Sequence, residues 1–65
     1  MKREQVIERI TPLIDRAIEV IETDDNDKIM GAIIRLNGKA TKENDYEAFI
    51  EVTIIGLLLD EGLSK

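Results

Sequence analysis

The side chains that most often perform catalysis are nearly missing from this chain. It has no His and no Cys, and its one Ser, Ser64, is the residue before the last. A nucleophilic Ser needs an ordered position beside a base, which a chain terminus does not offer. The four glycines are isolated from one another, so they do not form the Gly-rich loop that cradles a phosphate. We therefore expect a protein that is not an enzyme.

Residues 24–27, with the sequence DDND, are the first place to look for a metal site, because calcium and magnesium bind clustered carboxylates. A calcium-binding loop needs oxygen ligands at alternate positions, followed by Gly and a later Glu. Counting from Asp25 puts Ile29 at the third ligand position, and counting from Asp24 puts Lys28 there. We expect no metal and no cofactor, and we interpret the segment as a turn followed by a helix N-cap.

Three glutamates and three basic residues remain as candidates for binding. Glu43, Glu47 and Glu51 follow one another at four-residue intervals, and no basic residue lies four positions from Glu47 or Glu51. On a helix they form either a solvated face or an acidic ridge that binds a basic patch on a partner protein. The second group would contact phosphates and consists of Arg35, Lys39 and Lys42.

The net charge argues against nucleic acid as the main partner. Fourteen acidic residues against nine basic ones leave the chain at −5, which repels a phosphate backbone. No base-reading side chain accompanies the three basic residues. A nucleic-acid-directed regulator is therefore the alternative function, either through weak phosphate binding or through mimicry of nucleic acid by the acidic chain.

The first segment that must position these groups is an amphipathic helix. Between residues 6 and 21 the apolar residues recur every three to four positions, with charged residues opposite. Pro12 interrupts the pattern, so either Thr11 caps a new helix or one helix continues with a kink. We favour a first helix kinked at Pro12, because the apolar stripe keeps its phase across the proline.

A second helix is expected to begin near Asn26 and to end at Asn37 and Gly38, since Gly often supplies the left-handed residue that closes a helix. Asn-Gly is also a strong hairpin signal, and residues 48–55 are rich in β-branched side chains. The alternative fold is therefore α+β, with residues 29–36 and 48–55 paired as strands.

The third helix is expected to begin at Asn44, with Glu47 as its capping-box partner, and to end at Gly62 with an apolar contact from Leu63. Its apolar residues fall into two stripes on nearly opposite sides. One stripe consists of Ala48, Val52, Ile55 and Leu59, and the other of Tyr46, Ile50, Ile54 and Leu57. A helix that is apolar on both sides is normally buried on both sides.

The length of the chain indicates what covers the second apolar side of the third helix. A chain of 65 residues hides only about 60% of its unfolded surface, and small domains compensate with disulfides, metals or oligomerisation. Without Cys or His, oligomerisation remains. We predict an all-α, three-helix single domain over residues 1–65 that forms a homodimeric helical bundle, with a dimer interface of Ala48, Val52, Ile55 and Leu59. The alternative is a monomeric bundle whose first two helices each cover one stripe.

Function follows from these expectations. Charged residues interrupt the N-terminal segment where a secretion signal would need an apolar core, and residues 52–59, the longest uncharged apolar run, are too few to cross a bilayer. The lack of Cys fits a reducing cytoplasm. We expect a soluble cytoplasmic protein, non-enzymatic and regulatory or accessory, that acts through protein–protein contacts as a homodimer.

Overall fold

The computed structural model describes residues 2–62, and these residues form three helices without any strand. The helices are α1 (Arg3–Glu22), α2 (Asn26–Lys42) and α3 (Tyr46–Asp60). The all-α prediction is confirmed. The α+β alternative is wrong, because residues 29–36 lie in α2 and residues 48–55 lie in α3. No helix within residues 2–62 combines the length and the apolar character needed to cross a membrane.

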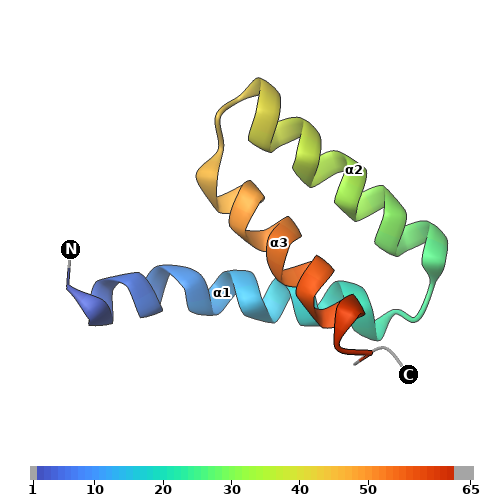
Figure 1. Ribbon diagram of the computed structural model, residues 1–65, viewed down its shortest axis with the longest axis horizontal. Coiled ribbons are helices and arrows are strands. Elements are labelled where there is room, and N and C mark those ends of the chain that lie inside the picture. The colour runs from blue at the N-terminus through green and yellow to red at the C-terminus, as the bar shows by residue number, and fades with distance from the viewer. Residues whose placement is uncertain (1, 63–65) are drawn as a thin grey trace.

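The third helix is the centre of the arrangement (Figure 1). It packs against both α1 and α2, whereas α1 and α2 contact each other much less. α2 and α3 run antiparallel, and the N-terminal half of α1 extends away from α2. The Cα atoms extend over 36 × 26 × 16 Å. The molecule is therefore flat, and the buried residues of α3, which are Ala48, Glu51 and Ile55, lie on one side of the helix.

The core lies where the three helices meet. Each helix contributes apolar residues one or two turns apart, which puts them on one face. The buried apolar residues are Leu13, Ala17, Ile21, Ile29, Ala32, Leu36, Ala48 and Ile55. A fully buried aliphatic side chain stabilises a fold by about 1.5–3 kcal/mol, so this small set must supply most of the hydrophobic stabilisation within one chain.

Helix α1 continues through Pro12 as a single helix. Both Pro12 and Glu8, whose carbonyl loses its usual donor, are exposed, so water can reach that carbonyl. The Thr11 hydroxyl donates to the Ile7 carbonyl at 2.7 Å and does not cap a new helix. One helix across the proline is thus confirmed, and a kink at Pro12 stays a prediction.

The junction between α1 and α2 has the turn and cap that the DDND segment predicts. Asp24 adopts a left-handed conformation with φ of 50°. Asp25 is the N-cap of α2, and its Oδ1 accepts hydrogen bonds from the backbone N–H groups of Asp27 and Lys28 at 2.9 and 3.3 Å. The Asp25 carboxylate therefore satisfies two backbone donors at the start of a helix.

The predicted end of α2 is wrong. Asn37 and Gly38 are helical, and α2 continues to Lys42 because Ala40 packs against the core one turn after Leu36. The left-handed residue that separates α2 from α3 is Asn44, with φ of 54°.

The predicted start of α3 is wrong by one residue. Asp45, and not Asn44, is the N-cap, because its Oδ1 accepts from the Ala48 backbone N–H at 3.1 Å. At the other end, Gly62 has φ of 73°, which confirms the predicted left-handed stop. The expected contact of Leu63 lies outside the described residues.

Candidate protein–protein interface

One side of α3 points away from the rest of the molecule and is almost entirely apolar. We call it the outer face of α3, formed by Tyr46, Phe49, Ile50, Thr53 and Leu57. Tyr46, Leu57 and Phe49 are 80%, 57% and 52% exposed. On a helix these positions lie opposite Ala48 and Ile55, which are buried against α1 and α2.

The outer face is hollowed on the side of α1. A groove of about 230 Å³ runs between α1 and α3, lined by Val6, Ile10, Leu13, Tyr46 and Ile50 together with Arg9 and Glu47. A broader apolar depression of about 400 Å³ lies along α3 itself and also includes Tyr46 and Ile50. Because the two hollows have these residues in common, they form one continuous apolar surface.

The polar residue within the outer face does not oppose its burial. The Thr53 hydroxyl donates to the Phe49 carbonyl, one turn earlier in α3, at 2.7 Å. Its hydrogen bond is therefore made within the helix, and its methyl group is what remains to contact another surface. Covering the outer face would leave no unsatisfied donor at this position.

The stripe that we expected to meet a second copy is instead covered by the chain's own helices. Ala48 and Ile55 are buried, at 4% and 0% exposure, and Val52 is partly buried against the core, whereas Leu59 is 37% exposed. The opposite stripe is more exposed, with Tyr46, Ile50 and Leu57 at 80%, 37% and 57%, although its fourth member, Ile54, packs partly against the core. Both stripes were visible in the sequence, but their similar apolar character did not indicate which of them faces α1 and α2.

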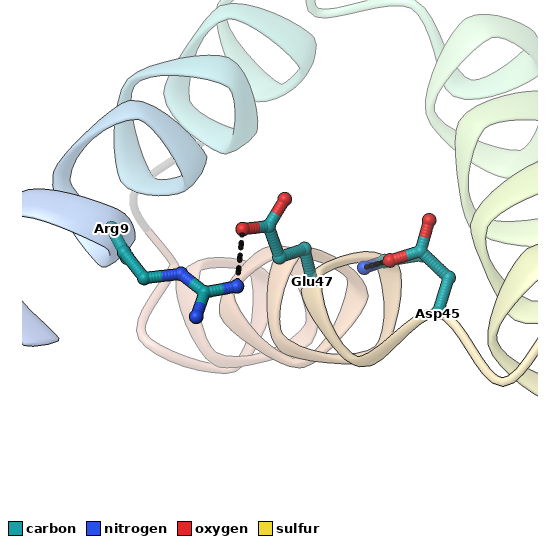
Figure 2. Close-up of polar contacts among 4 residues, drawn as sticks. Arg9, Asp45 and Glu47 are labelled. Atoms are coloured by element: carbon teal, nitrogen blue, oxygen red, sulfur yellow. Dashed lines mark hydrogen bonds and ion pairs between the residues drawn. The ribbon is translucent and has the colours of Figure 1, made fainter. Parts of the chain in front are cut away.

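The acidic ridge does not exist as one exposed, uncompensated surface. Glu51 is buried at 5% exposure, and its Oε1 accepts a hydrogen bond from Arg16 Nε at 2.9 Å. Figure 2 shows the Glu47 carboxylate beside the guanidinium of Arg9, with Oε2 and Nη2 3.0 Å apart. Glu43 is the C-cap of α2 and lies outside α3.

The compensating residues were missed because they are remote in sequence. Arg9 and Arg16 precede their partners by 38 and 35 positions, so helix spacing within α3 gives no sign of them. Both arginines reach α3 from α1. Partner binding by Glu43, Glu47 and Glu51 stays a prediction, but the two ion pairs already account for two of the three carboxylates.

The three basic residues that were candidates for phosphate binding do not all line one groove. Arg35 and Lys39 line a polar groove of about 330 Å³ between the helices, and Lys42 is not among its lining residues. Arg16 joins them from α1. The acidic residues of the same groove are Asp45, Glu47 and Glu51. With as many acidic as basic side chains, this groove is not a strongly positive surface of the kind that attracts a phosphate backbone.

Comparisons with known proteins add no assignment to this geometry. No protein-family model matches the chain, and neither curated proteins nor solved structures provide a match. Among residues 2–62, no group of three His, Cys, Asp or Glu side chains is placed to hold a metal ion. The exposed surfaces of the three helices are therefore the features that bear on function.

Proposed function

We propose that this chain is a small non-enzymatic regulatory or accessory protein that acts through protein–protein contacts as a homodimer. The observation that carries the proposal is the outer face of α3. This helix carries apolar residues on two nearly opposite sides, yet only the side holding Ala48 and Ile55 is buried. A helix with this composition is normally buried on both sides, and a continuous exposed apolar surface is typical of an interaction site.

The accessible surface of the chain supports a second copy as the cover. The chain exposes 5054 Å², whereas a folded monomer of 7.4 kDa is expected to expose about 4,200 Å². The excess, about 850 Å², is close to the roughly 800 Å² that each partner buries in an interface of standard size. Two-fold homodimers are the commonest soluble oligomers, so a second copy is the simplest occupant.

Light scattering coupled to size-exclusion chromatography tests the homodimer. At micromolar concentration we expect twice the chain mass, and the unfolding temperature should rise with concentration because folding and association are linked by mass action. A protein that elutes at the chain mass, with a melting temperature independent of concentration, would contradict the proposal.

A matched pair of variants locates the contact. Leu57→Asp should give a folded monomer, because it places an unpaired charge in a buried interface. Ile34→Asp introduces the same charge at an apolar residue of α2 that is 67% exposed, and it should leave the dimer intact. Circular dichroism verifies that both variants remain helical.

A further protein partner is part of the same proposal. Glu43 is exposed, and the Glu47 side chain keeps 47% of its accessible surface despite its ion pair. Both can therefore contact a basic patch on that partner. Glu43→Lys, at a residue that does not line the groove between α1 and α3, should reduce capture of the partner at low salt without changing the oligomeric state. Unchanged capture would assign Glu43 to a solvated face.

The nucleic-acid-directed alternative has less support. Arg35 and Lys39 share their groove with acidic side chains, and the net charge of −5 opposes phosphate binding at long range. A filter-binding measurement with single- and double-stranded DNA at low salt tests it. Binding that is lost in Arg35→Glu, Lys39→Glu and Lys42→Glu would favour this function over the proposed one.

A further inference from the structure

The outer face of α3 also determines how a second copy fits. We infer that the two α3 helices of the homodimer pack antiparallel, about a two-fold axis that passes between Ile50 and Thr53. This inference rests on the proposed homodimer and specifies its geometry. Three features of the outer face carry it: the spacing of its residues, the charges at its two ends and the groove beside α1.

The spacing along the outer face suits a helix pair. Tyr46, Ile50, Thr53 and Leu57 are separated by four, three and four residues, the alternation that lets two helices pack along a common seam. This series is symmetric about the midpoint between Ile50 and Thr53. In an antiparallel pair centred there, Tyr46 meets the mate's Leu57, and Ile50 meets the mate's Thr53. Each level then pairs a larger side chain with a smaller one.

Charge favours the antiparallel direction. The C-terminal end of α3 carries Asp60 and Glu61 and has no basic residue in its last turn, and the helix terminus itself is partially negative. Among the described residues, neither carboxylate makes an ion pair. A parallel pair would bring these ends together with their counterparts in the mate, which costs free energy through repulsion between like charges.

At the N-terminal end of α3, the acidic side chains of Asp45 and Glu47 already have partners. Asp45 accepts the backbone N–H of Ala48, and Glu47 pairs with Arg9. The exposed N-terminus of the helix is partially positive. An antiparallel pair therefore places the uncompensated Asp60 and Glu61 of one copy at the end of α3 that repels them least.

The groove between α1 and α3 has an occupant in this arrangement. Leu57, which is 57% exposed, faces the mate at the level of Tyr46 and Ile50. Those two residues form one wall of the groove, and Val6 and Ile10 of α1 form the other. The Leu57 side chain of each copy thus enters the groove of its mate, and α1 becomes part of the interface.

The absence of cysteine makes thiol cross-linking a clean test. Single substitutions Thr53→Cys, Asp60→Cys and Ile34→Cys are treated with a short bis-maleimide, and the products are separated by denaturing electrophoresis. Thr53→Cys should cross-link efficiently because it lies beside the axis. Asp60→Cys should not, because at 1.5 Å per residue its two copies are separated by about 25 Å along the helices. Ile34→Cys on α2 is the matched control and should remain uncross-linked.

The outcomes distinguish the inference from the proposal it rests on. Cross-linking of both Thr53→Cys and Asp60→Cys would mean a parallel pair and would overturn the inference. A dimer that cross-links through neither variant would place the contact on another face and would also overturn the inference. Ile50→Cys, equally near the axis, repeats the Thr53→Cys measurement if that variant folds poorly by circular dichroism. A monomeric wild type would instead overturn the homodimer itself.

Discussion

Arg16 on α1 and Glu51 on α3 form an ion pair in which one partner is buried and the other reaches solvent. Arg16 Nε lies 2.9 Å from Glu51 Oε1, and the exposed fractions of the two side chains are 57% and 6%. Glu51 lies one turn before the buried Ile55, and it lines the polar groove that also contains Arg35 and Lys39. The pair therefore links the interior of α3 to the surface of α1, and both helices must be in register for it to form.

Arg16→Met should lower the free energy of unfolding by about 1–3 kcal/mol, because it leaves the buried Glu51 carboxylate without its donor. Adding Glu51→Met should recover most of the loss, since an apolar pair removes the buried charge. Arg9→Met, at a pair whose side chains are 62% and 47% exposed, is the control and should cost less than about 1 kcal/mol. Urea unfolding at a fixed chain concentration measures all of these, and equal losses at Arg9 and Arg16 would contradict the burial of Glu51.

Asp45→Ala should destabilise the protein by about 1 kcal/mol, because the side chain of Asp45 caps α3 through the Ala48 N–H. Asn44→Gly should leave stability unchanged or raise it slightly, since glycine adopts the left-handed φ of 54° without strain. Thermal unfolding followed by circular dichroism compares the two variants. If Asn44→Gly destabilised the protein and Asp45→Ala did not, the N-cap of α3 would be Asn44 and not Asp45.

Gly38→Ala should raise the free energy of unfolding by about 0.5–1 kcal/mol, because Gly38 lies inside α2 and an added Cβ would meet nothing within 4 Å. Gly62→Ala is the contrasting variant. It should cost about 1 kcal/mol or more, since its φ of 73° is unfavourable for a residue with a Cβ. The same thermal measurement should show shifts of opposite sign, and a loss at Gly38 would mean that α2 ends where the Asn-Gly signal suggested.

Ile55→Val should lower the free energy of unfolding by about 0.5–1.5 kcal/mol through a small cavity in the core. We expect this loss in the wild type and in the monomeric Leu57→Asp background alike, because Ile55 contacts the chain's own helices. Urea unfolding in both backgrounds separates folding from association. A loss confined to the wild type would place Ile55 at the dimer interface instead.

Helix ends show how far local sequence can be trusted in this chain. The DDND segment and Gly62 were interpreted correctly, because capping depends on side chains and backbone groups within a few residues. Asn37 and Gly38 were misinterpreted for a reason that is not local. Glycine in a helix interior destabilises the helix by about 1 kcal/mol relative to alanine. The packing of Ala40 against the core offsets this cost, so α2 continues beyond Gly38.

By itself, the sequence determined that the chain is helical, that a helix begins near Asn26 and that α3 has two apolar sides. These properties depend on periodicity and on capping chemistry, which are readable over one or two turns. Only the tertiary structure decided which side of α3 is inside and which charges are paired. Ala48 and Ile55 are buried in the core, whereas the similarly apolar Tyr46 and Leu57 are exposed. Glu47 and Glu51 form ion pairs with Arg9 and Arg16, which lie more than thirty positions earlier in the chain. Such choices depend on how helices far apart in sequence pack together, and the spacing within one helix contains no information about its neighbours.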